Sequence, residues 1–386
     1  MQKTGINMER VKKENRSLIL NYINDNGPVS RIDIAEATGL TAASVTQITT
    51  ALISEGILCE TGISSEKKSS AGRKKVLLAI NADAAFVLSI NIETETTTIA
   101  ICNLLGEVLY VGTQRLFSCI PTDKKISPQK FLKKVSDECV SLLLKLGKTK
   151  AKRIACTSIG IPGIVDNSLG IAVHAYGIWD EPVNLAEYFE DSLGYPVLVE
   201  NNVDAFAIGE ILFGHGRTQD SLLVIKWGPG VGSTIVIDKQ VYKGRHGKTA
   251  ELGHFIVERN GQKCTCGRSG CLETVVSQKA LMSFMDFKPE KFGEAYEKAN
   301  VTTKRKINST IDLFARSIVN TCTIIAPNRI VLSGILFSSP LIREILIKYC
   351  KKYDPAYDGN RIIYTKLYEK EAYIGPVAVY LNTLLN

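Results

Sequence analysis

The central glycine-rich segment of the chain reads Leu223-Val-Ile-Lys-Trp-Gly-Pro-Gly-Val-Gly-Ser-Thr-Ile-Val-Ile237, and an Asp238-Lys239 turn and a further apolar segment, Val241–Lys243, follow it. An earlier segment has the same order, Val87-Leu-Ser-Ile-Asn-Ile-Glu-Thr-Glu-Thr-Thr-Thr-Ile-Ala-Ile-Cys102, with a turn at Gly106 and then Val108–Val111. Short runs of β-branched residues between turn residues are typical of strands. The chain therefore contains two copies of a strand, loop, strand, turn, strand unit.

The residues around the two units predict a layered α/β fold. From Phe86 onward, strand-like and helix-like periods alternate along the chain. We expect the two units to face each other across a cleft. The loop Gly228–Ser233, and Gly160–Gly163 after a strand over Ile154–Ile159, can each cradle a phosphate or simply connect two elements.

Three of the ten cysteines lie within eight residues, in the order Cys264-Thr-Cys-Gly-Arg-Ser-Gly-Cys271. Gly267 and Gly270 allow this segment to fold back on itself, and His254 precedes it. Three thiolates and an imidazole bind zinc tetrahedrally, and four protein ligands make such a site structural. The sequence predicts one structural zinc ion per chain, held by His254, Cys264, Cys266 and Cys271. Three thiols without metal are the alternative.

The first eighty residues predict three helices followed by a β-hairpin. An apolar stripe over Asn15–Asn26 (Leu18, Ile19, Tyr22 and Ile23) indicates the first helix, which Gly27 and Pro28 end. Ser30 and Asp33 have the pattern of a capping box at the start of a short second helix, which ends at Thr38-Gly39.

The third helix of this region has an uncharged polar face. Thr41 can cap it, and no charged residue occurs between positions 41 and 54. Its expected inward residues are Val45, Ile48 and Leu52, and its expected outward residues are Ser44, Thr46, Gln47 and Thr50. Hydroxyls and amides can hydrogen-bond base edges in the major groove. Two helices joined by a short turn at this spacing are typical of a helix-turn-helix, so these four outward residues are predicted to bind DNA.

A basic loop follows the third helix. Two strand-like segments, Ile57–Thr61 and Val76–Ile80, flank the polar loop Ser64–Lys75. We expect Arg73, Lys74 and Lys75 to lie on the DNA phosphates, as the wing of a winged helix-turn-helix does. A three-helix packing or dimerisation module with a solvated loop is the alternative.

Composition narrows the class of protein further. With 45% hydrophobic and 22% charged residues, the 386-residue chain can bury a large core, which argues against disorder. The net charge of +8 permits an anionic partner without requiring one. Apolar runs are too short for a membrane helix, and the first ten residues lack the apolar core of an export signal. We therefore expect a cytoplasmic protein with no membrane partner, in which the cysteines stay reduced.

Taken together, these motifs resemble the ROK family (repressors, open reading frames, sugar kinases), and the front helices resemble its repressor branch, which includes xylose and N-acetylglucosamine repressors. The resemblance covers nearly the whole chain. It rests most on Glu251-Leu-Gly-His254 and on the cysteine segment with Leu272-Glu273. It implies a two-lobed, actin-like (ribonuclease-H-like) sugar-kinase fold. It also implies that the residues which bind a sugar are Asn201, Asn202, Glu251, His254 and Glu273, with the loop His174–Trp179 as another wall of the pocket.

Three departures from the family's kinases imply that the chain is not an enzyme. Where the kinases have the aspartate that takes the proton from the sugar hydroxyl, this chain has Asn202, whose amide cannot act as a base. The first phosphate loop reads Asn91-Ile-Glu-Thr-Glu95, so two carboxylates face the position of the ATP phosphates. The Gly-Gly near the adenine becomes Ser333-Gly334. No catalytic residue is therefore assigned.

The resulting prediction is a DNA-binding transcriptional repressor of sugar-utilisation genes that a carbohydrate effector releases from its operator. Residues 1–82 would form the winged helix-turn-helix, residues 83–200 with 370–386 the first lobe, and residues 201–369 the second lobe with the zinc site and the surface for a homodimer or tetramer. An active ATP-dependent sugar kinase with a DNA-binding front end, and a scaffold that binds no effector, are the alternatives. The sequence leaves open the effector, sugar or sugar phosphate, the operator, the direction of regulation and residual nucleotide binding.

Overall fold

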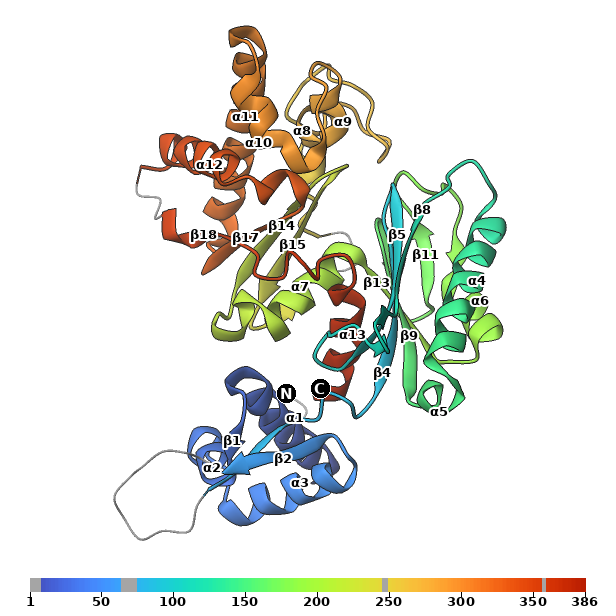
Figure 1. The fold of residues 1–386 in the computed structure, drawn as a ribbon. Coiled ribbons are helices and arrows are strands. Elements are labelled where there is room, and N and C mark those ends of the chain that lie inside the picture. The colour runs from blue at the N-terminus through green and yellow to red at the C-terminus, as the bar shows by residue number, and fades with distance from the viewer. Residues whose placement is uncertain (1–7, 64–74, 245–248, 356–358) are drawn as a thin grey trace, which may run out of the picture.

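The computed structural model describes residues 8–63, 75–244, 249–355 and 359–386. Within these residues the chain forms a small N-terminal unit, two α/β lobes that each contain a five-stranded sheet, and two helices between the lobes (Figure 1). In the described part of the chain, no helix combines the length and the apolar character needed to cross a membrane.

The N-terminal unit is a three-helix bundle with a small antiparallel sheet in the order β1-β3-β2. Its elements are α1 (Met8–Asn26), β1 (Val29–Ser30), α2 (Arg31–Thr38), α3 (Ala42–Ser54), β2 (Leu58–Ile63) and β3 (Val76–Ile80). The capping box predicted at Ser30 and Asp33 is present, and Gly39 ends α2 in the left-handed conformation. The first helix begins at Met8, earlier than the predicted Asn15. The sequence did not predict its first turns because they are polar and have no apolar stripe. Leu18, predicted to face the core, is 45% exposed, and Leu20 is buried instead.

The first lobe is built on a sheet in the order β13-β9-β4-β5-β8. Its strands are β4 (Phe86–Ile92), β5 (Thr96–Asn103), β8 (Phe117–Pro121), β9 (Ile154–Ile161) and β13 (Val197–Asn201). Helices α4 (Pro128–Leu146), α5 (Lys148–Ala151) and α6 (Leu185–Leu193) belong to this lobe, and α4 and α6 lie together on one side of the sheet (Figure 1). Its short strands are β6 (Tyr110–Val111), β7 (Gln114–Arg115), β10 (Ile164–Asp166), β11 (Ile171–His174) and β12 (Val183–Asn184).

The second lobe repeats the same topology, in the order β16-β15-β14-β17-β18. Its strands are β14 (Leu222–Trp227), β15 (Val231–Ile237), β16 (Gln240–Val241), β17 (Arg329–Ser333) and β18 (Ile362–Tyr364). Its helices are α8 (Leu272–Val276), α9 (Gln278–Met282), α10 (Phe292–Lys298), α11 (Val301–Ile325) and α12 (Pro340–Tyr353). Short 3₁₀ turns are η1 (His215–Thr218), η2 (Leu252–His254), η3 (Pro289–Lys291), η4 (Ile335–Ser338) and η5 (Gly359–Arg361).

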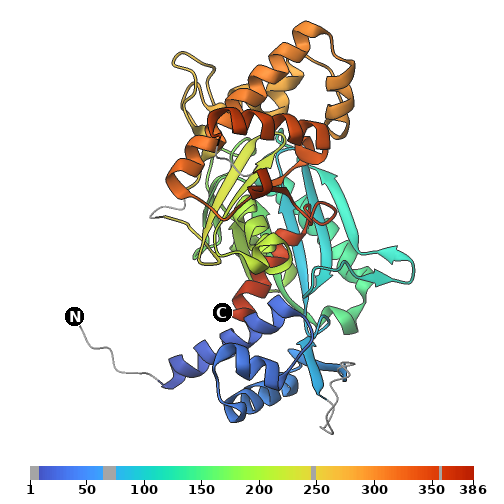
Figure 2. The same ribbon diagram turned by 90° about the vertical axis from the view of Figure 1, so that its left-hand side faces the viewer.

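The predicted duplication is thus confirmed, with one correction in the first unit. In both sheets the first strand pairs antiparallel with the second and parallel with a strand that follows a helix. In the first lobe, however, β8 is the neighbour of β5. The predicted third strand, Val108–Val111, makes only a bridge from Val108 to Cys102 and then continues into the β6–β7 hairpin, which projects from the lobe (Figure 2).

Two helices, α7 (Asn202–Phe213) and α13 (Ile374–Leu385), pack against each other between the lobes (Figure 1). Helix α13 lies on β4 and β9, whereas α7 also contacts β15 of the second lobe. The close approach favours glycine, because a Cβ at Gly375 would lie only 3.0 Å from the backbone of Ala205. Helix α7 therefore belongs to the packing of both lobes.

The N-terminal unit is docked directly on these central helices. Ile19 and Leu20 of α1 share one hydrophobic cluster with Ile211 and Leu385. The Asn24 amide donates to the carbonyl of Leu212 at 3.1 Å, and Arg217 donates to the carbonyl of Asn24. Lys239 Nζ lies 2.7 Å from Asp25 Oδ2. These contacts fix the end of α1 against the C-terminal end of α7 and the β15–β16 turn.

Candidate functional site

Helix α3 presents the uncharged polar face that the sequence predicts. Thr41 caps the helix by accepting a hydrogen bond from the Ser44 backbone N–H at 3.2 Å. Val45 and Leu52 are buried, which turns Thr46, Gln47 and Thr50 to the surface. Ser44 is half-buried, and its hydroxyl accepts from Thr41 Oγ1 at 2.9 Å. An exposed, uncharged helix face of this kind can enter the major groove without an internal charge to desolvate.

The predicted wing lies largely outside the described residues, including Arg73 and Lys74. Lys75 is described, and its Nζ lies 2.7 Å from Asp33 Oδ1. This ion pair, together with the Ser30 hydroxyl, lowers the pKa of Asp33. Lys75 therefore links the base of the hairpin to the start of α2.

A cavity of about 1230 Å³ lies between the lobes. Its walls include the β4–β5 loop and Tyr176 of the first lobe, the start of α7, and the glycine-rich β14–β15 loop of the second lobe. All five sugar-binding candidates of the sequence line it, namely Asn201, Asn202, Glu251, His254 and Glu273. The cavity therefore brings these five candidates together, although Asn201 and Glu273 are far apart in the chain.

The two asparagines begin α7. The Asn201 side chain accepts from the backbone N–H groups of Val203 and Asp204 at 2.8 and 3.1 Å, and donates to the carbonyl of Gly163 at 2.8 Å. The Asn202 amide donates to Glu93 Oε1 at 3.2 Å. Asn202 thus occupies a position where it can offer a hydrogen bond to a hydroxyl, but its amide has no basic oxygen.

Glu93 Oε1 also accepts a hydrogen bond from Lys226, a residue that sequence reasoning missed. Lys226 Nζ lies 2.6 Å from Glu93 and 3.3 Å from Glu371. Burial opposes the charge on Glu93, but the attraction of Lys226 outweighs it and keeps the pKa of Glu93 below its usual value. The three residues bridge the β4–β5 loop of the first lobe and β14 of the second.

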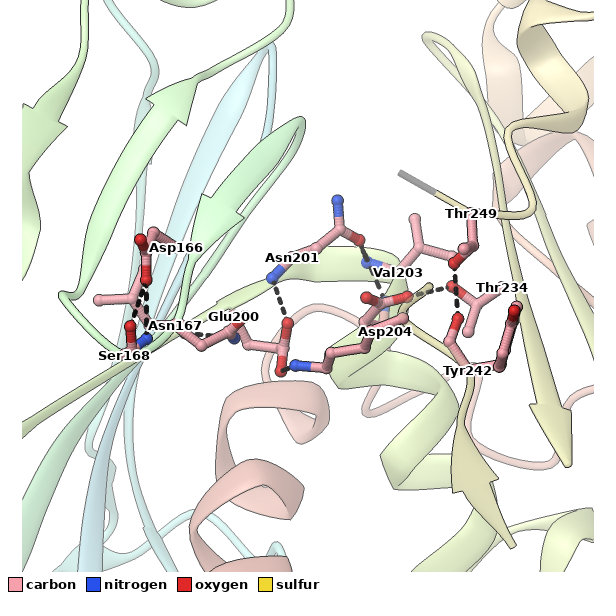
Figure 3. Close-up of polar contacts among 12 residues, drawn as sticks. Asp166, Asn167, Ser168, Glu200, Asn201, Val203, Asp204, Thr234, Tyr242 and Thr249 are labelled. Carbon is pink, nitrogen blue, oxygen red and sulfur yellow. Dashed lines mark hydrogen bonds and ion pairs between the residues drawn. The ribbon is translucent and has the colours of Figure 1, made fainter. Parts of the chain in front are cut away.

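A second carboxyl group, that of the half-buried Asp204, lies at the start of α7 (Figure 3). Asp204 points toward Thr234 of β15, whose hydroxyl donates to Asp204 Oδ1 at 2.5 Å. Burial, followed by repulsion from Glu200, raises the pKa of Asp204 to about 6. Glu200 itself pairs with Lys243 of the second lobe. The cleft thus holds a carboxyl group that gains its charge near pH 6.

The pKa of Asp204 gives a prediction about stability. The pKa of Asp204 is higher in the folded protein than its unfolded value of 3.8. The stability that the neutral carboxyl group gives is therefore fully present below pH 3.8 and is lost as the pH rises to about 6. Asp204→Asn keeps an acceptor for Thr234. We expect it to raise the free energy of unfolding by about 3 kcal/mol at pH 8 and by about half of that at pH 5, in urea titrations. The exposed Asp286→Asn is the control, and an equal change at both pH values would contradict the assignment.

The predicted metal ligands come together at the edge of the cavity. The ligand atoms of His254, Cys264, Cys266 and Cys271 all lie within 4.8 Å of one another. His254 Nδ1 is 3.5 Å from Cys264 Sγ, and the Sγ atoms of Cys266 and Cys271 are 3.7 Å apart. Burial lowers the pKa of His254 to about 4, so its imidazole is neutral, as a metal ligand must be.

The backbone of the cysteine loop is shaped for this arrangement. Gly270 has a positive φ of 75°, and a Cβ there would lie 1.9 Å from the carbonyl oxygen of Glu258. The Cys264 N–H donates to the carbonyl of Arg268 at 2.8 Å, which closes the turn. Three thiols and one imidazole fit the donor set of tetrahedral zinc. Helix α8, which directly follows this loop, carries Glu273, whose Oε2 accepts from the Val231 N–H at 2.9 Å.

Comparisons with known proteins agree with both parts of the structure. The model of the ROK family matches residues 87–382, and a winged helix-turn-helix DNA-binding model matches residues 13–58. A putative xylose repressor of Caldicellulosiruptor sp. (strain Rt8B.4) is 28% identical over 400 residues, 97% of each chain. The DNA-binding transcriptional dual regulator NagC of Escherichia coli is 26% identical over 275 residues, 71% of this chain and 65% of NagC.

Solved structures extend the likeness. The crystal structure of a ROK family transcriptional regulator, described as a homologue of the E. coli MLC protein, is 26% identical and covers 97% of both chains with a TM-score of 0.79. A ROK family glucokinase from Streptomyces griseus, solved with glucose and AMPPNP, is 19% identical and covers 76% of this chain and 99% of its own, with a TM-score of 0.64. The second likeness concerns the fold alone.

Proposed function

The chain belongs to the ROK family, and from that premise we propose that it is a cytoplasmic transcriptional repressor of sugar-utilisation genes, released from its operator by a carbohydrate bound between the lobes. In this proposal residues 1–82 bind operator DNA. Residues 83–200 with 370–386, and residues 201–369, form the two lobes and a homodimer or tetramer. The observation that carries the proposal is the exposed, uncharged face of α3 on a unit that is docked against the body of the protein.

Helix α7 connects the proposed sugar site to the proposed DNA-binding unit. It begins at Asn202 in the cavity and ends at Phe213, beside the α1 contact at Leu212. A helix of this length spans about 18 Å and transmits a shift of one end to the other. A change in the angle between the lobes on sugar binding would therefore move α1. In a dimer, that movement would disturb the spacing of two recognition helices, which must lie about 34–36 Å apart.

The proposal assigns no catalytic residue, in keeping with relatives that are named repressors. Asn201, Asn202, Glu251, His254 and Glu273 are proposed to contact the sugar. A zinc ion held by His254, Cys264, Cys266 and Cys271 is proposed to fix the wall that carries Glu251 and Glu273. Its role is structural, because four protein ligands leave no open position for a reacting water.

Gln47→Ala tests the assignment of α3 as the recognition helix. Its exposed amide is the longest uncharged hydrogen-bonding group on this face, and one base contact is worth about 1–3 kcal/mol. We expect the variant to bind its operator, isolated by selection from genomic fragments, roughly 5- to 150-fold more weakly, with sugar affinity unchanged. The control is Gln114→Ala, an exposed glutamine on the β6–β7 hairpin. If Gln47→Ala left specific binding intact and Gln114→Ala weakened it, α3 would not be the reading helix.

A further inference from the structure

The cavity contains several groups that ordinarily bind phosphate in proteins. The start of α7, the backbone of the glycine-rich β14–β15 loop and the ammonium group of Lys226 line it. Two further groups lie next to lining residues: the turn at Gly334, which follows the strand partner of Lys226, and Lys243, which pairs with Glu200 beside Asn201. Backbone N–H groups at helix starts and glycine loops, and lysine side chains, are the usual phosphate donors. A phosphorylated sugar or a nucleotide would need some of them to be available.

In the described residues, a side chain already accepts from at least one backbone N–H of each of these three segments. The Asn201 amide oxygen accepts from the N–H groups of Val203 and Asp204 at the start of α7. Glu273 Oε2 accepts from the Val231 N–H of the glycine-rich loop at 2.9 Å. Glu371 Oε2 accepts from the Gly334 N–H at 3.1 Å. Two of these three acceptors are carboxylates, so a phosphate at the same position would meet negative charge.

Carboxylates also neutralise the two lysines. Lys226, with a side chain only 16% exposed, lies between Glu93 at 2.6 Å and Glu371 at 3.3 Å. Lys243 pairs with the buried Glu200. Like charges placed side by side repel each other strongly when water is excluded. A phosphate group next to Asn202 would approach Glu93, because the Asn202 amide donates to that carboxylate.

We propose that the cleft selects an uncharged sugar, and that Glu93, Glu273 and Glu371 are the specificity-determining residues that exclude phosphorylated sugars and nucleotides by occupying the groups that would bind a phosphate. The inference rests on the proposed function, because it defines the chemical class of the effector. Uncharged hydroxyls meet no charge repulsion at such a site, since they can donate to the carboxylates and accept from the Asn202 amide.

Other cations line the same cavity and define the competing outcome. Lys279 lies on α9, and Lys306 and Arg316 lie on α11. The hydroxyl-binding candidates lie on other elements, namely the start of α7, η2 with its preceding residue, and α8. A sugar phosphate that reached these cations would bind at least as well as the free sugar. The two outcomes differ in which ligand binds more tightly, the free sugar or its phosphate, and this can be measured on the unmodified protein.

Titration calorimetry with matched pairs tests the inference. Glucose is compared with glucose 6-phosphate, N-acetylglucosamine with its 6-phosphate, and xylose with xylose 5-phosphate, on the full-length protein. We expect at least one free sugar to bind and its phosphate to bind at least about 100-fold more weakly. Equal or tighter binding of a phosphate would overturn the inference and leave the proposed function in place. If no member of any pair bound, although the operator did, the effector part of the proposed function would fail together with the inference.

Glu93→Gln tests the residue assignment directly. Glutamine can still accept from Asn202 and Lys226, so the variant mainly removes charge. We expect the ratio of sugar affinity to sugar-phosphate affinity to fall at least about tenfold, and likewise for Glu371→Gln, which acts on the other side of Lys226. Glu344→Gln, an exposed residue of α12, makes the same charge change outside the cleft and should leave the ratio unchanged. If both cleft variants folded and kept the wild-type ratio, these carboxylates would not set the specificity.

Discussion

Replacing Cys266 with alanine is expected to reduce the bound zinc from one equivalent per chain to less than about a tenth, and to weaken sugar binding at least about 100-fold. Structural zinc sites contribute on the order of 10 kcal/mol or more to the order of the segments that they join. Here the proposed ligands His254 and Cys271 lie close in the chain to the proposed sugar contacts Glu251 and Glu273. Loss of the metal would therefore free both carboxylates at once.

The measurement is metal analysis of protein purified without chelator, combined with sugar titration of the same sample. Cys119→Ala is the matched control, because Cys119 is an exposed thiol of β8 in the other lobe. Wild-type protein with less than about half an equivalent of zinc would contradict the prediction. So would a Cys266→Ala protein that kept its sugar affinity.

A second large effect is expected in phosphoryl transfer. We expect the protein to show no ATP-dependent phosphorylation of common hexoses, pentoses or amino sugars at an enzyme-like rate of about 1 s⁻¹. Asn202 cannot accept the proton of the attacking hydroxyl, and this base commonly contributes a factor of about 10²–10⁴. Glu93 and Glu371 hold Lys226 in the cleft, so charge also opposes the phosphates.

Restoring the base alone should therefore not restore activity. In Asn202→Asp the new carboxylate would lie beside Glu93, because the native amide donates to that residue at 3.2 Å. The assay uses labelled ATP with a sugar panel, and the S. griseus type of ROK glucokinase serves as the positive control. Turnover near 1 s⁻¹ in either the wild-type protein or Asn202→Asp would show that the cleft is catalytic after all.

The features that could be predicted from the sequence are mostly local. The caps at Ser30 and Thr41, the grouping of Cys264, Cys266 and Cys271, and the doubled strand units depend on residues close together in the chain. The structure contains the features that these strong local patterns predict. The predicted third strand at Val108–Val111 is present only in part: Val108 bridges Cys102 at the end of β5, whereas Tyr110–Val111 pair with β7, and β8 pairs with the first part of β5.

The missing features are pairings between distant residues. Glu93, Lys226 and Glu371 form one ion-paired group from three separate parts of the chain, and no periodicity links them. In the sequence, Lys226 is a single charged residue within an apolar strand. Charged residues in such strands are rarely buried unless paired, and this was the available signal of an ion-pair partner. The docking of α1 on α7 and α13 depends on which helix faces meet. No regular spacing of residues in the sequence indicates these faces.

The central claim is that sugar in the cleft weakens operator binding by the N-terminal unit. The most direct measurement is the operator affinity of the full-length protein, with and without a saturating sugar that calorimetry has shown to bind. We predict a fall of about 5- to 150-fold, and by linkage the operator must weaken sugar binding by the same factor. Glu251→Ala should bind the operator normally and fail to be released at the same sugar concentration. An operator affinity that no bound sugar changes, or a folded Glu251→Ala protein that cannot bind the operator, would contradict the account.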